Sequence, residues 1–329
     1  LTLVLACAAA AAPAALEAQA PAAPLVLSLD EAVSRAEASS HRIAEARARG
    51  EAAAAAVGTR HASLLPQVAA QAGYTRTNHI DEFGILLPNN QFRVIYPDIP
   101  DNYRTRLDVQ WPVYTGGRLN ALERAARQDE AAASSGVAAV GVDVRLDTTR
   151  AFWSLVVARE ALRVTGESLV RMEAHVVTVG NQVEAGVLPP NEVLTARAQA
   201  ARQRMLVAQA RSNRDVAEAD LARLVGVPAG TGIEPAAALA PPSTSADVSA
   251  LVGEAREHRP DRRALLERLE ASGLRREAAT AGHRPTVAVG GGVDYARPNP
   301  RIFPRMRDWR ESWDASINVN WPLFDGGRT

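Results

Sequence analysis

The chain contains no lysine, a single cysteine and no excess of either charge, and each of these absences excludes a class of function. All 37 basic residues are arginine, and they balance 37 acidic residues. Without lysine there is no Walker-type phosphate loop, no Schiff-base chemistry and no protein-kinase centre. One cysteine forms neither an internal disulfide nor a thiolate metal cluster. The balanced charge argues against a nucleic-acid partner.

Signs of catalytic chemistry are equally scarce. The six histidines show no metal-ligand spacing such as HExxH. No set of nucleophile, base and orienting group can be picked out. Gly290, Gly291 and Gly292 precede neither a helix nor a lysine, so they indicate a strand that makes room for a neighbour or bends. We therefore expect no catalytic residues, no metal site and no cofactor, and we do not expect an enzyme.

The N-terminal stretch, residues 1–20, is predicted to be the remnant of a secretory signal peptide. An apolar, alanine-rich run leads into Ala18-Gln19-Ala20, a small-x-small cleavage site. Cys7 follows Val4-Leu5-Ala6, which leaves a lipoprotein site open as the alternative. Both interpretations predict an exported protein.

An internal repeat organises the rest of the chain. The string Trp111–Arg118 recurs nearly unchanged at Trp321–Arg328, and Leu64–Ala69 corresponds to His283–Ala288. A repeat this long indicates a duplicated half-molecule rather than a solenoid. We predict a first repeat start at residues 21–120, a helical hairpin at 118–225, a linker at 226–246 and a second repeat at 247–329. Because the first Trp-Pro string opens a helix, we expect the second copy to be truncated before its last hairpin.

The second strand of each copy alternates between apolar and polar residues, which places the two kinds on opposite faces of a sheet. The polar set comprises Arg104, Arg106, Asp108, Gln110, Asp314, Ser316, Asn318 and Asn320. Alternation alone favours a half-buried soluble sheet, but aromatic placement favours a sheet that spans a membrane, since a tilted strand crosses a bilayer in about 9–11 residues. The predicted interface aromatics are Tyr103, Trp313 and Tyr295 near one strand end and Trp111 and Trp321 near the other.

Two long helices are predicted between the repeats. From Val140 to Val183, apolar residues recur in steps of three and four, which is typical of a coiled coil. Gly186 ends this helix, the prolines after Leu188 form a tight turn, and Asn191 is expected to cap the return helix. On the return helix we predict a packing stripe formed by Leu194, Ala198, Ala201, Met205 and Ala208.

Four strands per chain cannot close a membrane barrel, whose smallest single-chain forms use about eight. An open sheet edge in lipid would leave backbone groups without hydrogen bonds. Several copies are therefore expected to share one barrel, with the polar strand faces lining a water-filled lumen. The fold class is mostly α with a small β part, namely long antiparallel coiled-coil hairpins plus four membrane-spanning strands per chain.

In these features the chain resembles the TolC-type outer membrane efflux proteins. The resemblance covers about residues 28–329 and rests on the opening segment Leu27–Val33, the Leu65-Pro66-Gln67 junction, both Trp-Pro…Gly-Gly-Arg strings and the hairpin turn Glu184–Leu188. It implies a homotrimer with a single twelve-stranded barrel in the bacterial outer membrane and a helical tunnel across the periplasm. It also implies passive export of small molecules or proteins, delivered by an inner-membrane transporter through a periplasmic adaptor.

The resemblance places the adaptor-contact tip on Gly186, Val187 and Leu188, with the neighbouring acidic position at Glu192. An apolar pair at an exposed turn also favours a partner contact over a plain turn. For the charged strand residues, a solvated lumen face is the more ordinary interpretation than a substrate filter. Two other functions stay open at this point, a periplasmic coiled-coil scaffold with a soluble β-domain and, less favoured, a secreted enzyme.

Overall fold

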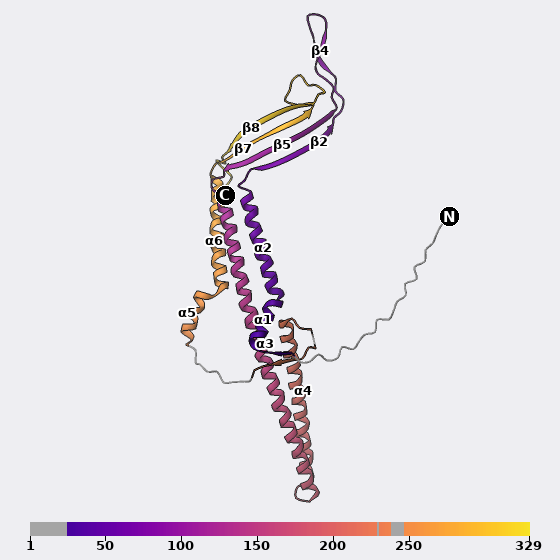
Figure 1. Ribbon diagram of the computed structural model, residues 1–329, viewed down its shortest axis with the longest axis vertical. Coiled ribbons are helices and arrows are strands. Elements are labelled where there is room, and N and C mark those ends of the chain that lie inside the picture. Colours follow the sequence, from indigo (N-terminus) through magenta and orange to yellow (C-terminus); the bar gives the residue numbers. More distant parts are fainter. Residues whose placement is uncertain (1–24, 229, 238–246) are drawn as a thin grey trace, which may run out of the picture. The chain divides into compact units, whose positions relative to one another are not determined.

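The computed structural model describes residues 25–228, 230–237 and 247–329, which fall into two compact units (Figure 1). One unit comprises the described parts of Leu1–Ile43 and Val140–Asp247, and the other comprises Ala44–Ala139 and Val248–Thr329. The predicted signal-peptide remnant with Cys7, and residues 238–246 of the predicted linker, lie outside the described residues.

A helical hairpin dominates the first unit. Helix α3 runs from Arg118 to Glu184, and its residues from Val140 onward belong to this unit. Helix α4 runs back from Asn191 to Val225. Both helices occupy the segment where the sequence predicts them. The segment predicted as a linker contains a short strand, β6 (Ile233–Pro235), which pairs in parallel with β1 (Leu25–Leu27).

The core of this unit joins both hairpin helices to the two short strands. Phe152 and Leu155 of α3 are fully buried together with Leu221 of α4, Leu27 of β1 and Ile233 of β6. Helix α1 (Leu29–Ser39) adds Ala32 to the same cluster. The burial of apolar side chains that stabilises this unit is therefore concentrated in this cluster.

The predicted packing face is confirmed on α3 and wrong on α4. On α3, Val144, Thr148 and Leu155 of the predicted stripe are buried. On α4 the predicted stripe is exposed, with Leu194 65% and Met205 61% accessible, and the buried positions are Ala196, Ala200, Ala210 and Ala217. Alanine occurs on every side of α4, so its sequence does not define one face. Small side chains at the contact allow two helices to lie close together, so alanines face the core and the larger residues point outward.

Local capping chemistry sets the start of α1 and the end of α3 but not the start of α4. Ser28 and Glu31 form a reciprocal capping box at the start of α1. Gly186 follows the end of α3 with φ +74°, the left-handed conformation that glycine adopts without strain. The prediction that Asn191 caps α4 is wrong, because Pro190 occupies the N-cap position and no side chain bonds to the free amides there. Pro189 and Pro190 instead restrict the backbone of the turn that precedes α4.

The second unit contains a four-stranded antiparallel sheet in the order β2-β5-β7-β8. The strands are β2 (Gln67–Arg76), β5 (Asp101–Tyr114), β7 (Thr286–Arg297) and β8 (Arg310–Asn320). A separate two-stranded hairpin, β3 (Phe83–Leu86) and β4 (Phe92–Tyr96), lies between β2 and β5 in the sequence. The two repeats therefore meet at the β5–β7 pairing, and β2 and β8 are the outer strands.

The strand registers confirm the internal repeat. Within the first repeat Gln67 pairs with Gln110, and the equivalent Thr286 pairs with Asn320 in the second. The junction tryptophans behave alike as well. The indole nitrogen of Trp111 donates to the carbonyl oxygen of Leu64 at 3.0 Å, and that of Trp321 donates to the carbonyl oxygen of His283 at 3.1 Å. These equivalent bonds tie each strand end to the end of the preceding helix.

Helices lead into the sheet from both repeats. They are α2 (His41–Ala62), α5 (Val248–His258), α6 (Pro260–Thr280) and the 3-10 turn η1 (Ala281–His283). Polar side chains connect α2 and α6 to the start of α3. Arg124 pairs with Glu277 of α6 at 2.8 Å, and Glu123 accepts from Arg127 at 2.8 Å and contacts Nδ1 of His61 in α2 at 3.1 Å. Hydrogen bonds from Arg127 and His61 hold the pKa of Glu123 below its usual range.

Candidate functional site

The polar residues predicted on β5 and β8 share one face of the sheet. The register places Arg106 opposite Asp294 of β7, and Asp108 opposite Gly292, which is in turn opposite Asp314 of β8. Since side chains alternate along a strand, the other polar residues, which lie an even number of positions away along β5 and β8, point to the same face. The structure thus brings together on one face the whole polar set, Arg104, Arg106, Asp108, Gln110, Asp314, Ser316, Asn318 and Asn320.

An ion-pair network crosses the middle of this face. The guanidinium of Arg106 contacts Asp108 at 2.6 Å, Asp314 at 2.9 Å and Asp294. The Nε atom of Arg104 donates to Asp294 at 2.6 Å. Asp294 is only 2% exposed, so its buried carboxylate is compensated by two arginines. Three strands from both repeats are thereby connected through charged side chains.

Asp294 is the member of this network that the sequence analysis did not identify. Its strand alternates weakly, because the residues of the same parity before it are Gly290 and Gly292 rather than polar side chains. The alternation places Asp294 in step with Gly290 and Gly292. Only the pairing of β5 with β7 shows that this position lies on the same face as Arg106.

The glycine run on β7 makes room for Arg106, which agrees with the first of the two interpretations that the sequence left open. A Cβ atom added at Gly292 would lie 2.8 Å from Nη2 of Arg106 and 2.8 Å from the carbonyl oxygen of Leu107. A Cβ at Gly291, on the opposite face, would meet the carbonyl oxygen of Asp314 at 2.8 Å. The absence of side chains lets the guanidinium lie across β7 and reach β8.

The opposite face of the sheet exposes large apolar side chains. Leu107 is 48% accessible, Val293 53%, Trp313 77% and Ile317 72%. Water-exposed apolar surface of this extent indicates a face that contacts an apolar medium or partner. The strands have 10, 14, 12 and 11 residues, enough for a tilted strand to cross a bilayer.

The predicted interface aromatics lie on diagonals rather than on hydrogen-bonded rows. In the register of the sheet, Trp313 of β8 is level with Leu107 of β5, and Leu107 lies four residues after Tyr103. Trp111 lies in the row of Ile317, four positions along β8 from Trp321. A constant offset is what tilted strands require of residues at equal membrane depth. The assignment of these residues to the membrane interface stays a prediction.

Additional aromatic contacts gather near the start of β5. Tyr103 lies 4.9 Å from Tyr74 and 5.9 Å from Trp309, and Tyr295 stacks on Trp309 at 5.0 Å between ring centres. Trp309 was not identified from the sequence, because it lies in the loop just before β8, outside the alternating pattern. It connects the predicted aromatics Tyr103 and Tyr295.

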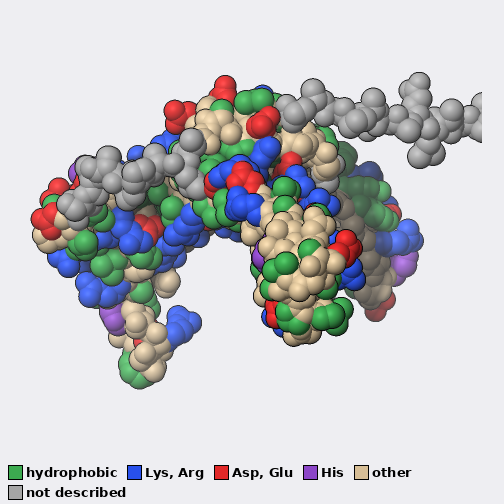
Figure 2. Space-filling model, turned by 90° about the horizontal axis from the view of Figure 1, so that it is seen from below, with side chains coloured by type: hydrophobic (Ala, Val, Ile, Leu, Met, Phe, Trp, Pro, Cys, Tyr) green, Lys and Arg blue, Asp and Glu red, His purple; other side chains and the backbone are tan. Residues whose placement is uncertain are grey.

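The hairpin tip presents apolar side chains to solvent. The amide of Val187 donates to the carbonyl oxygen of Gln182 at 2.8 Å, which closes the end of α3. Val187 is 71% exposed, whereas Leu188 and Glu192 are half-buried. Figure 2, viewed from the hairpin end, shows hydrophobic side chains among uncharged surface there, and hydrophobic, basic and acidic side chains mixed over the rest of the face. The role of the tip as an adaptor contact stays a prediction.

Within the described parts of the chain, no helix is both long and apolar enough to cross a membrane. Those same residues contain no group of three or more His, Cys, Asp or Glu side chains placed to hold a metal ion.

Comparison with known proteins identifies the family. Residues 32–227, more than half of the chain, match the family described as Outer membrane efflux protein. The chain belongs to the outer membrane efflux protein family. It is therefore a protein of the bacterial outer membrane, as the sequence predicted.

Relatives of this outer membrane efflux protein agree with that assignment. It is 29% identical over 308 residues to Protein CyaE of Bordetella pertussis (strain Tohama I), covering 91% of this chain and 61% of CyaE. The chain thus spans about three-fifths of the length of this curated relative.

Solved structures share the fold of this outer membrane efflux protein. A membrane protein from Pseudomonas aeruginosa superimposes with a TM-score of 0.72 at 22% identity, over 91% of this chain and 67% of that one. The Campylobacter jejuni CmeC outer membrane channel gives 0.71 at 18% identity, over 91% and 62%. The outer membrane protein VceC from Vibrio cholerae gives 0.71 at 20% identity, over 91% and 69%.

Proposed function

We propose that this chain is one subunit of a trimeric outer-membrane exit duct. Three copies would each contribute strands β2, β5, β7 and β8 to a single twelve-stranded barrel, with the polar face lining the lumen and the apolar face in contact with lipid. The long α3–α4 hairpins would continue the wall into the periplasm. The observation that carries the proposal is the two-faced sheet with its outer strands β2 and β8.

Closure by several copies follows from the energetics of backbone groups in lipid. Each unsatisfied amide or carbonyl costs several kcal/mol in the bilayer core, so an open edge strand is not viable there. Pairing β8 of one copy with β2 of the next would satisfy both edges. Family membership supports the same arrangement, because channels of this family are outer-membrane proteins.

The duct would serve a tripartite efflux or type I secretion system. Its cargo, small molecules or proteins, would be delivered by an inner-membrane transporter through a periplasmic adaptor that contacts the tip at Gly186, Val187, Leu188 and Glu192. Transport would be passive, because the chain carries no lysine-containing nucleotide site to drive it.

Disulfide cross-linking in outer membranes tests the shared barrel. Ala70→Cys on β2 is combined with one cysteine at a time along β8, and the protein is oxidised before denaturing electrophoresis. A shared barrel predicts covalent dimers and trimers at the pairs in register. Leu107→Cys with Val293→Cys serves as the matched control, because these residues pair within one chain and should cross-link without changing the mass.

Light scattering of the detergent-extracted protein, with the micelle subtracted, provides the second readout. A mass of three chains supports the duct. The proposal fails if the control pair cross-links but no intermolecular product forms, and if the protein is also a monomer or soluble without detergent. These results would show that the strands do not share a barrel. The periplasmic scaffold would then be the better description.

A further inference from the structure

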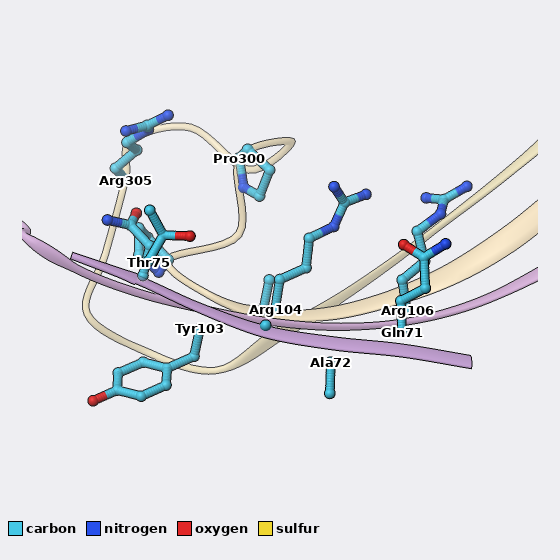
Figure 3. Close-up of a pocket in the computed structure, with 12 residues that line it drawn as sticks. Gln71, Ala72, Thr75, Tyr103, Arg104, Arg106, Pro300 and Arg305 are labelled. Carbon is cyan, nitrogen blue, oxygen red and sulfur yellow. The ribbon is translucent and has the colours of Figure 1, made fainter. Parts of the chain in front are cut away.

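A pocket of about 320 Å³ lies on the polar face of the sheet, at the end of the strands away from α2 and α6. Strands β2 and β5 form its floor, and the loop between β7 and β8 lies over it (Figure 3). Arg104 and Thr75 project from the strands toward the loop, whereas Tyr103 points to the other side of the sheet (Figure 3). Pro300 and Arg305 line the pocket from the loop. Its volume is at the lower end of the range for small-molecule sites, about 300–1,000 Å³.

The loop that covers the pocket is anchored to the sheet. Asn299, only 3% exposed, donates through Nδ2 to the carbonyl oxygen of Arg310 at 3.0 Å and to Oγ of Ser312 at 3.0 Å. Arg301 forms an ion pair with Asp314 at 2.7 Å. These bonds attach the first part of the loop, after β7, to β8, so this wall of the pocket is held in place before any ligand arrives.

Arginine side chains gather around the pocket. None of the twelve residues that line it is acidic, and three of them are Arg104, Arg106 and Arg305. Arg106 is neutralised, since it contacts the carboxylates of the central network. Arg104 donates only its Nε to Asp294 and is 54% exposed at its side chain. The guanidinium of Arg305 lies 5.0 Å from the ring centre of Tyr96, a neutral partner that leaves its charge uncompensated.

We propose that this pocket binds an anion carrying two or more carboxylate or phosphate groups, held by Arg104 and Arg305. A guanidinium presents a planar fork of donors that matches both oxyanions, and charge-assisted bonds of this kind are about twice as strong as neutral ones. Pro298 and Pro300 supply rigid apolar walls beside the charged groups. If the sheet lines a duct as proposed above, the site lies in the lumen near its mouth and favours passage of anionic cargo.

Binding is tested directly by titration calorimetry on the protein purified in detergent, with citrate and inorganic pyrophosphate as separate probes. The probe that binds more tightly tells whether carboxylate or phosphate groups are preferred. Arg104→Gln and Arg305→Gln should each weaken binding about tenfold or more, as expected for the loss of one hydrogen bond to a charged group. Arg60→Gln, an exposed arginine on α2, is the matched control and should leave the affinity unchanged.

Equal affinities in the wild type and both pocket variants, or a wild type that binds neither probe, would overturn the proposal. Circular dichroism and the oligomeric mass show that the variants are folded. Conductance across a planar bilayer separates this proposal from the duct itself. If the protein forms a pore but binds no anion, the anion-site proposal is wrong and the duct proposal stands. If it binds anions but forms no pore, the duct proposal is wrong and the anion-site proposal stands.

Discussion

Replacing Phe152 with alanine should destabilise the core that joins the hairpin helices to strands β1 and β6. Phe152 is fully buried in one cluster with Leu155, Leu221 and Ile233, and its ring meets Trp153 edge-on at 5.7 Å between centres. The substitution removes the ring and leaves a cavity that its neighbours fill only in part. All the elements that share the cluster are expected to lose stability together.

The size of the effect follows from the complete burial of the ring. Phe-to-Ala substitutions in protein cores cost about 3–5 kcal/mol, which already includes the aromatic contact. A loss of about 4 kcal/mol corresponds to about a thousandfold larger equilibrium constant for local opening. Since domains are stable by only about 5–15 kcal/mol, a loss of this size is readily measured.

Hydrogen exchange followed by mass spectrometry, on protein extracted from outer membranes in detergent, measures this opening segment by segment. Protection should fall in the peptides that contain Phe152, Leu221 and Ile233. The matched control is Phe83→Ala, the same substitution at a side chain that is 65% exposed on β3. It should change the protection of those peptides by less than about 0.5 kcal/mol.

Two results would refute the reasoning. The first is equal protection in Phe152→Ala and Phe83→Ala, which would mean that the buried ring contributes nothing to the cluster. The second is a loss confined to the peptide around the substituted residue. In that case the hairpin and the short strands would not share one core.

Three further predictions concern the tip, a carboxylate and the sheet. Charged substitutions, Val187→Glu with Leu188→Glu, should abolish export by cells while outer-membrane insertion stays normal; unimpaired export would contradict the tip assignment. Glu123 has a lowered pKa, so its stabilising contribution is complete above the ordinary value of 4.5 and is lost as the pH falls through the folded-state pKa. In Glu123→Gln, thermal stability should therefore depend less on pH across that acidic range. The same pH dependence of thermal stability in wild type and variant would argue against the effect. Gly292→Ala should cost about 1–3 kcal/mol of stability by overpacking and reduce the yield of assembled protein. Gly73→Ala, the control, has open space around it and should leave the yield unchanged. Equal yields of the two variants would contradict the close approach of Arg106 to Gly292.

Several features of this protein were determined by its sequence alone. The period-two alternation on β5 and β8 decides which residues share a face, because a side chain cannot change sides without a shift of register. The repeated Trp-Pro strings located the equivalent strand ends of both repeats, and their tryptophans make equivalent bonds to Leu64 and His283. Gly186 marked the end of α3, since only a residue tolerant of positive φ fits there. These features depend on local geometry, which each segment carries by itself.

Only the tertiary structure decided the packing face of α4, the charged network and the covered pocket. An alanine-rich helix has several equivalent apolar sides, and the contacts with α1, α3 and the two short strands select one of them. Asp294 reaches Arg104 and Arg106 across about 190 residues of sequence, through a pairing between the two repeats that no local pattern specifies. The pocket likewise depends on where the loop before β8 folds back. Such properties arise from contacts between distant segments, whose free energy is decided by the assembled shape and not by any one stretch of chain.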